Sequence, residues 1–186
     1  MKELEIRLNP NPLVQFLKKP AAEFTRQDII YFIEENEIEM VNFRYVGEDG
    51  KLKSLNFVLN SKQHLEDLLS TGERVDGSSL FSYIEAGSSD LYVIPRFKTA
   101  FVNPFSDYPT LDILCSFYTR EGLPLESAPE HILRKAIEEF RKSTGYDFKA
   151  MGELEYYVVS EKDEMYPGID QKGDHESPPF TKNGDT

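Results

Sequence analysis

The sequence predicts an α+β fold over residues 26–120. Two runs of alternating apolar residues flank a Gly-rich turn at 47–50, which is typical of a β-hairpin. A short helix and then further strands follow this hairpin, so helices and strands do not alternate as they do in βαβ folds. The composition, with 39% hydrophobic and 12% aromatic residues in a chain of 186, supports a packed core.

The chain before the hairpin predicts a lead-in and one helix. Residues 1–25 contain three prolines and indicate a short irregular segment. Thr25, followed three residues later by Asp28, is typical of a helix cap, and apolar residues at helical spacing continue to about Asn36.

The elements after the first helix are predicted from alternating apolar residues and from residues that cap helices. Hairpin strands are expected around 41–45 and 55–59. Ser61 caps a second short helix, and Gly72 ends it. Two further strands are expected, at 91–94 and 111–118.

Residues 121–186 predict the beginning of a second domain. Ser127 and Glu130 stand at capping-box spacing, and apolar residues at helical spacing continue until Gly145. A strand is expected at 148–159, followed by a polar tail. One helix and one strand do not complete a domain, which predicts that this unit is truncated.

Charge and cysteine content limit the classes of function. There are 33 acidic and 21 basic residues, and the net charge of −12 argues against nucleic-acid and membrane binding. No apolar run approaches membrane-spanning length, and the first residues lack the layout of a secretory signal, so a cytoplasmic location is expected by default. The single cysteine, Cys115, excludes an internal disulfide and lies on the apolar face of a predicted strand, as a buried thiol would.

Two glutamates on the last predicted strand are candidate metal ligands. Side chains alternate along a strand, so Glu153 and Glu155 share one face, about 7 Å apart at the backbone. Carboxylate pairs of this kind suit Mg²⁺ or Mn²⁺. The alternative is a half-exposed strand that presents two glutamates to water.

The second candidate is the loop Asp76-Gly77-Ser78-Ser79. Asp-Gly is a common turn dipeptide, so a tight connection between elements is one interpretation. The other is a glycine-enabled loop that presents the carboxylate of Asp76 and nearby hydroxyls to a small cation such as ammonium.

Four short motifs follow one another along the chain: D-G-S-S at 76–79, S-S-D-L-Y-V-I-P at 88–95, T-A-F-V-N-P-F at 99–105 and G-E-L-E-Y-Y at 152–157. In this order and at this spacing they resemble the N-terminal part of glutamine synthetases, over about residues 26–160. The resemblance implies a small β-grasp domain at 26–120 and the start of a catalytic αβ domain at 121–186.

The resemblance also implies an activity, ligands and partners. The family reaction is ATP-dependent: glutamate is phosphorylated on its γ-carboxylate, and ammonia then displaces phosphate to give glutamine. Glu153 and Glu155 match the family's Mg²⁺- or Mn²⁺-binding glutamates, and Asp76 and Ser79 match its ammonium-side loop. The implied assembly is a homo-oligomer of stacked rings, with each active site between two subunits.

The sequence departs from the family pattern at several positions. Ser82 and Tyr83 replace Gly-Phe, Arg96 replaces the Asp of P-D, and Asn103 replaces the Asp of D-P-F. These departures leave open a γ-glutamyl-polyamine ligase of the same family. A non-catalytic β-grasp interaction module is a third alternative, and as an isolated chain the protein is expected to be inactive.

Overall fold

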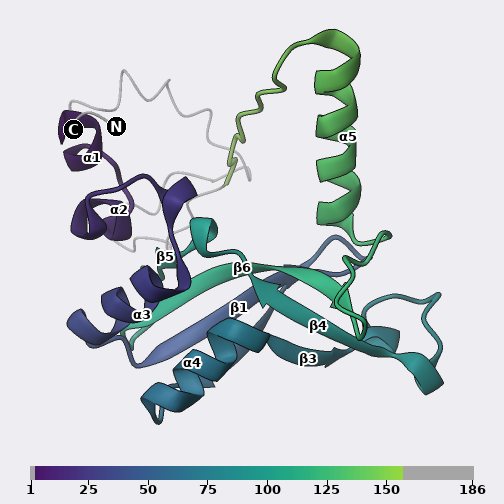
Figure 1. Ribbon diagram of the computed structural model, residues 1–186, viewed down its shortest axis with the longest axis horizontal. Coiled ribbons are helices and arrows are strands. Elements are labelled where there is room, and N and C mark those ends of the chain that lie inside the picture. The colour runs from purple at the N-terminus through teal and green to yellow at the C-terminus, as the bar shows by residue number, and fades with distance from the viewer. Residues whose placement is uncertain (1–2, 157–186) are drawn as a thin grey trace, which may run out of the picture. The chain divides into compact units, whose positions relative to one another are not determined.

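The computed structural model describes residues 3–156, and its parts divide into two units, Met1–Phe148 and Lys149–Thr186. Every helix and strand described lies in the first unit (Figure 1). Among these described residues, no helix is both long enough and apolar enough to cross a membrane.

The first unit is built on a six-stranded sheet with the order β2-β1-β6-β4-β3, in which β5 also pairs with β6. The strands are β1 (Met40–Val46), β2 (Leu52–Val58), β3 (Glu73–Asp76), β4 (Asp90–Pro95), β5 (Phe101–Val102) and β6 (Thr110–Thr119). Strands β1 and β2 form the predicted hairpin, and β1 runs parallel to the central strand β6. The other pairs are antiparallel.

Five α-helices and four 3₁₀ turns occur in the described residues. The helices are α1 (Glu3–Arg7), α2 (Pro12–Leu17), α3 (Arg26–Glu35), α4 (Lys62–Thr71) and α5 (Pro129–Thr144). The 3₁₀ turns are η1 (Ala21–Glu23), η2 (Gly77–Ser79), η3 (Ala86–Ser88) and η4 (Phe97–Thr99).

The core lies between one face of the sheet and the helices α3 and α4 (Figure 1). Alternate residues of β1 and β6 supply it: Phe43 and Ile113 are completely buried, and so is Ile29 of α3. Cys115 shares this face and is buried as predicted, and burial raises the pKa of its thiol. The thiol is therefore protonated at neutral pH and acts as a small apolar core group.

The caps of α3 and α4 are those that the sequence predicts. Thr25 accepts a hydrogen bond from the backbone N–H of Asp28, and the Asp28 carboxylate accepts one from the backbone N–H of Thr25. Ser61 accepts from the N–H of His64 at 3.1 Å, and Gly72 ends α4. These side chains satisfy backbone groups that the helix itself leaves without partners.

The prediction of an irregular lead-in is wrong, because this segment contains α1 and α2. Asn11 caps α2 by accepting from the N–H of Leu13 at 3.0 Å, and Pro12 occupies the first helical turn. Proline is well tolerated at that position, so Pro12 marks the start of a helix instead of a break. Leu13 and Val14 then enter the core.

The predicted strand at 148–159 is not found where the structure describes it. Residues 148–156 form neither helix nor strand, and 157–159 lie outside the described residues. A strand is stable only when its backbone N–H and C=O groups pair with a neighbouring strand. An alternating pattern of side chains along one segment does not provide the neighbouring strand.

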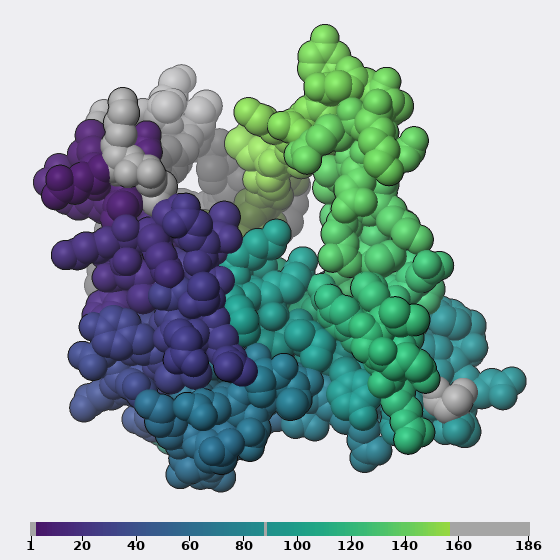
Figure 2. All heavy atoms as spheres, in the orientation of Figure 1, coloured from purple at the N-terminus to yellow at the C-terminus, as the bar shows by residue number. Residues whose placement is uncertain are grey.

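Helix α5 forms as predicted, but its capping box does not. Its N-cap residue is Ala128, which gives no side-chain hydrogen bond. Glu130 instead accepts the backbone N–H of Phe117 in β6 at 2.9 Å. The apolar residues Ile132 and Leu133 stay more than half exposed, and most of the helix stands clear of other elements of its unit (Figure 2).

Gly72 gives a first prediction. Its φ of +68° is strained for other residues, and a Cβ atom there would lie 2.3 Å from the carbonyl oxygen of Val93. We expect Gly72→Ala to lower the free energy of unfolding by about 2–3 kcal/mol in urea denaturation followed by tyrosine fluorescence. Gly50 is the matched control, because it has a φ of +72° and no atom within 4 Å of the added Cβ. Equal losses in both variants would contradict the role of the Val93 contact.

Candidate functional site

The Asp76 loop is a compact turn at the end of β3. The carboxylate of Asp76 accepts hydrogen bonds from the backbone N–H of Ser78 at 3.0 Å and from the Ser78 hydroxyl at 2.7 Å. The hydroxyl of Ser79 donates to the backbone carbonyl of Asp76, also at 2.7 Å. The two residues singled out in the sequence therefore do lie together, but Ser78 is the serine that holds the carboxylate.

Gly77 allows this turn to lie directly against β4. Its N–H donates to the carbonyl oxygen of Ser89 at 2.7 Å. A Cβ atom at Gly77 would come within 2.8 Å of that oxygen and 2.9 Å of the Leu91 side chain. The loop position is thus fixed from both sides, by the turn itself and by the strand behind it.

The electrostatics of the loop keep Asp76 ionised. Asp76 is exposed, and hydrogen bonds from the side chains of Ser78 and Ser89 hold the pKa of its carboxyl below its ordinary value. Asp90 lies directly opposite on β4, but its charge is paired with Arg74 at 3.3 Å. The arrangement presents one fixed, charged carboxylate that can bind a small cation and accept a proton from it.

A cavity of about 700 Å³ lies beside the loop. It is lined in part by Tyr83, Ser89, Asp90, Glu121 and Leu125. Asp76 and Ser79 do not line it themselves, but Ser89 does, and its carbonyl oxygen accepts the N–H of Gly77 in the Asp76 loop. The cavity offers carboxylates and apolar surface next to the loop.

Glu153 and Glu155 lie in the second unit and are exposed. Carboxylate oxygens are suitable Mg²⁺ or Mn²⁺ ligands. Among the residues that the structure describes, however, no group of three or more His, Cys, Asp and Glu side chains is placed to hold a metal ion. The described residues therefore do not assemble a complete metal site around this pair.

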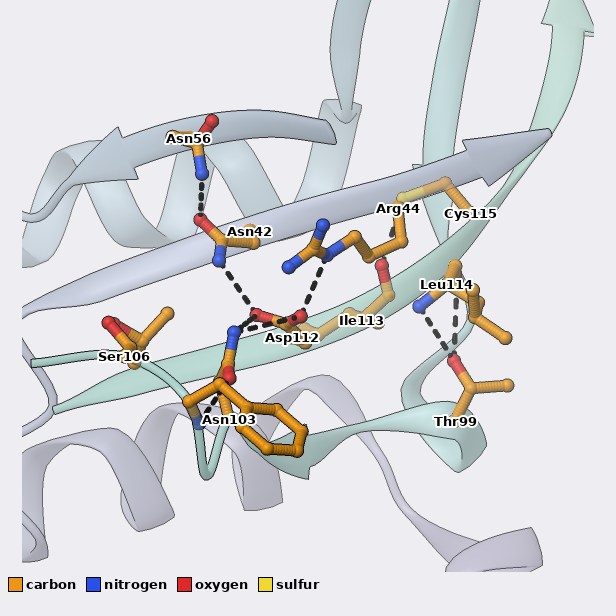
Figure 3. Close-up of polar contacts among 12 residues, drawn as sticks. Asn42, Arg44, Asn56, Thr99, Asn103, Ser106, Asp112, Ile113, Leu114 and Cys115 are labelled. Atoms are coloured by element: carbon orange, nitrogen blue, oxygen red, sulfur yellow. Dashed lines mark hydrogen bonds and ion pairs between the residues drawn. The ribbon is translucent and has the colours of Figure 1, made fainter. Parts of the chain in front are cut away.

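A buried carboxylate on the face of the sheet opposite the α3–α4 core escaped the sequence analysis (Figure 3). Asp112 of β6 is only 2% exposed. It accepts hydrogen bonds from Asn42 Nδ2 and Arg44 Nε, each at 2.7 Å, and from Asn103 Nδ2 at 3.3 Å. Asn56 extends the network by donating to Asn42 Oδ1 at 2.6 Å.

This network explains one departure from the family pattern. An aspartate at position 103 would place a second carboxylate beside that of Asp112, whereas Asn103 supplies a donor. With donors on both of its oxygens, Asp112 has a structural role. The sequence signal was an acidic residue near the start of a largely apolar strand.

Residues 37–120 match the glutamine synthetase β-grasp domain. The chain carries a glutamine synthetase β-grasp domain. The resemblance found in the motifs is thereby confirmed for this part, and curated glutamine synthetases are among the proteins to which the chain is similar. The start of a catalytic domain at 121–186 stays a prediction.

Two curated relatives illustrate the similarity. The glutamine synthetase of Methanococcus maripaludis is 26% identical over 136 residues, which cover 70% of this chain and 30% of the relative. The 3-hydroxylaminophenol mutase of Cupriavidus pinatubonensis is 29% identical over 119 residues, which cover 63% of this chain and 25% of the relative. The chain thus spans about a third or less of the length of these relatives.

A solved structure shows the same fold. Plasmodium falciparum glutamine synthetase superposes with a TM-score of 0.55 at 19% sequence identity. The match covers 67% of this chain and 24% of the other. At this identity the match supports the fold of the β-grasp domain and leaves the chemistry to the site residues.

Proposed function

We propose that this chain is the N-terminal part of an ATP-dependent glutamate–ammonia ligase. Its similarity to glutamine synthetases supports the reaction class, and the short span of the match indicates that the activity belongs to a longer protein. Glutamate, ammonium and ATP as substrates, a cytoplasmic homo-oligomer with sites between subunits, and inactivity of the isolated chain belong to the same proposal.

The observation that carries the proposal is the ionised, exposed carboxylate of Asp76 in a rigid turn. A carboxylate that accepts two hydrogen bonds from Ser78 has little freedom to move and can bind ammonium by charge and by hydrogen bonds. When it accepts a proton from ammonium, ammonia is released with a free lone pair and becomes the nucleophile. Because Asp76 is exposed, the proton can then pass to water.

We assign no step to a metal ion in the described residues. Glu153 and Glu155 are proposed as two of the Mg²⁺ or Mn²⁺ ligands of the longer protein. The reasons are that their carboxylate oxygens suit these ions and that the motif containing them resembles the family's metal-binding strand. A bound divalent ion would neutralise charge on the transferred phosphoryl group.

The size of the cavity favours a second candidate, a γ-glutamyl-polyamine ligase. A volume of about 700 Å³ beside the Asp76 loop is far larger than ammonium needs. Its lining combines the carboxylates of Glu85 and Glu121 with apolar surface from Leu125, as a diamine would require, although Arg120 also lines it. The name of the mutase relative shows that the similarity alone does not determine the substrate.

The test is to express the full product of the gene and to assay it with glutamate, ATP and either ammonium or a linear diamine. We expect glutamine formation that needs ammonium and a divalent ion, with the 186-residue chain alone as the inactive control. A higher kcat/KM for the diamine would favour the second candidate. A gene product that forms no γ-glutamyl amide, or that ends at Thr186, would reject the ligase in favour of the interaction module.

A further inference from the structure

Tyr83 and Ser127 connect two segments that are 44 residues apart in the sequence. Tyr83 lies four residues beyond the Asp76 loop, and Ser127 lies two residues before α5. Their hydroxyl groups are hydrogen-bonded to each other. Neither residue has been given a chemical step in the proposed reaction, although Tyr83 lines the cavity. Backbone bonds hold the segment before Ser127 to β6, where the N–H of Leu125 donates to the carbonyl oxygen of Phe117 at 2.9 Å, but they do not reach Tyr83.

The loop side of this connection is anchored in the core. Phe81 is 1% exposed, and its ring packs edge-on against Phe117 of β6 at a centroid distance of 5.1 Å. The ring of Tyr83 packs against the ring of Phe81, with a centroid distance of 5.7 Å. The backbone N–H of Phe81 returns to the carbonyl oxygen of Gly77 at 2.8 Å, so the position of Phe81 is tied to the Asp76 turn.

The helix side is anchored to the same strand. Glu130 accepts the backbone N–H of Phe117 at 2.9 Å, and Ala128 is completely buried. Phe117 therefore contacts the loop through its ring and α5 through its backbone. The hydrogen bond between Tyr83 and Ser127 joins the two sides directly, so that the loop and the start of α5 contact each other as well as Phe117.

We propose that Tyr83 is a positioning residue that couples the Asp76 loop to the base of α5 through its hydrogen bond with Ser127. Any displacement of the start of α5 then reaches the Asp76 turn through Tyr83 and Phe81. The proposed function enters only as the purpose of this coupling. In the proposed ligase, the coupling would set the position of Asp76 with respect to the residues after α5. The coupling itself is a property of the first unit.

The experiment is amide hydrogen exchange by NMR on the complete 186-residue chain, with Tyr83→Phe, Ser127→Ala and the double variant. Loss of one hydrogen bond is worth about a 2- to 12-fold change in a local opening equilibrium. We expect faster exchange by that factor in both segments, residues 77–81 and 130–132, for each single variant. The double variant should be no faster than either single one.

A second measurement separates coupling from a local packing effect. The carboxyl ¹³C signal of Asp76 reports its titration, and in Tyr83→Phe its pKa should rise toward the ordinary value as the turn loosens. Tyr31→Phe is the control, because it removes a hydroxyl from a half-exposed tyrosine on α3. Unchanged exchange at the Asp76 turn, an unchanged titration, or additive effects of the two single variants would overturn the coupling.

These measurements need no ligase activity. A gene product without ligase activity would reject the proposed function and leave the exchange and titration results intact. Conversely, an active ligase whose Asp76 turn is unaffected by Tyr83→Phe would reject only the coupling.

Discussion

Asp76→Asn in the full product of the gene should lower kcat/KM for ammonium by about 10²- to 10⁴-fold, the usual contribution of a positioned proton acceptor. Asparagine retains an oxygen that can accept the N–H of Ser78, so the turn is expected to survive. It loses the negative charge that binds ammonium and the capacity to accept its proton. The KM for ATP should change little, because the carboxylate is assigned to the amine.

Asp49→Asn is the matched control for this prediction. Asp49 is also an exposed aspartate in a turn, and a backbone hydrogen bond from Lys51 lowers the pKa of its carboxyl. It lies between β1 and β2, outside the Asp76 loop. Steady-state rates with varied ammonium should separate the two variants. Normal ammonium kinetics in Asp76→Asn, or an equal loss in Asp49→Asn, would remove Asp76 from the proposed mechanism.

Much of the first unit could be predicted because its signals are local. The hairpin, the cap at Thr25 and the end of α4 at Gly72 each depend on residues within a few positions of one another. The conformation of the Asp76 turn is similarly local, since Ser78 and Ser79 satisfy it from two and three residues away. Patterns of this range are visible in a single sequence.

The predictions were wrong where a side chain bonds to a residue distant in the sequence instead of to its local partner. Ser127 and Glu130 have the spacing of a capping box, but their side chains bond to Tyr83 and to the backbone of Phe117. A tertiary partner for each of them replaces the local cap. Glu153 and Glu155 alternate as in a strand, yet none of the described residues provides the neighbouring strand that alternation presupposes.

The Asp112 network could not be predicted for the same reason. Asn42 and Asp112 are 70 positions apart and meet only because β1 pairs in parallel with β6. In the sequence each is a polar residue in a largely apolar strand, and nothing local indicates which polar residue it will meet. Only the register Asn42↔Asp112 shows that the two polar residues face each other.

Asp112→Ala should therefore destabilise the first unit strongly. The substitution leaves the buried amide of Asn42 and the partly buried groups of Arg44 and Asn103 without their common acceptor. Removing one partner of a buried ion pair costs about 3–5 kcal/mol. Urea denaturation of the 186-residue chain, followed by tyrosine fluorescence, should show this loss in the free energy of unfolding.

Asp147→Ala supplies the comparison that assigns the loss to burial. Asp147 pairs with Arg141 at 2.6 Å, almost the same distance as the 2.7 Å between Arg44 and Asp112, but both side chains are more than 60% exposed. An exposed pair contributes about 1 kcal/mol or less. A double variant, Arg44→Leu with Asp112→Leu, removes both charges and should recover part of the stability that Asp112→Ala loses. If instead Asp112→Ala cost no more than Asp147→Ala, the carboxylate would not organise this face of the sheet, and Asn103 would need another explanation.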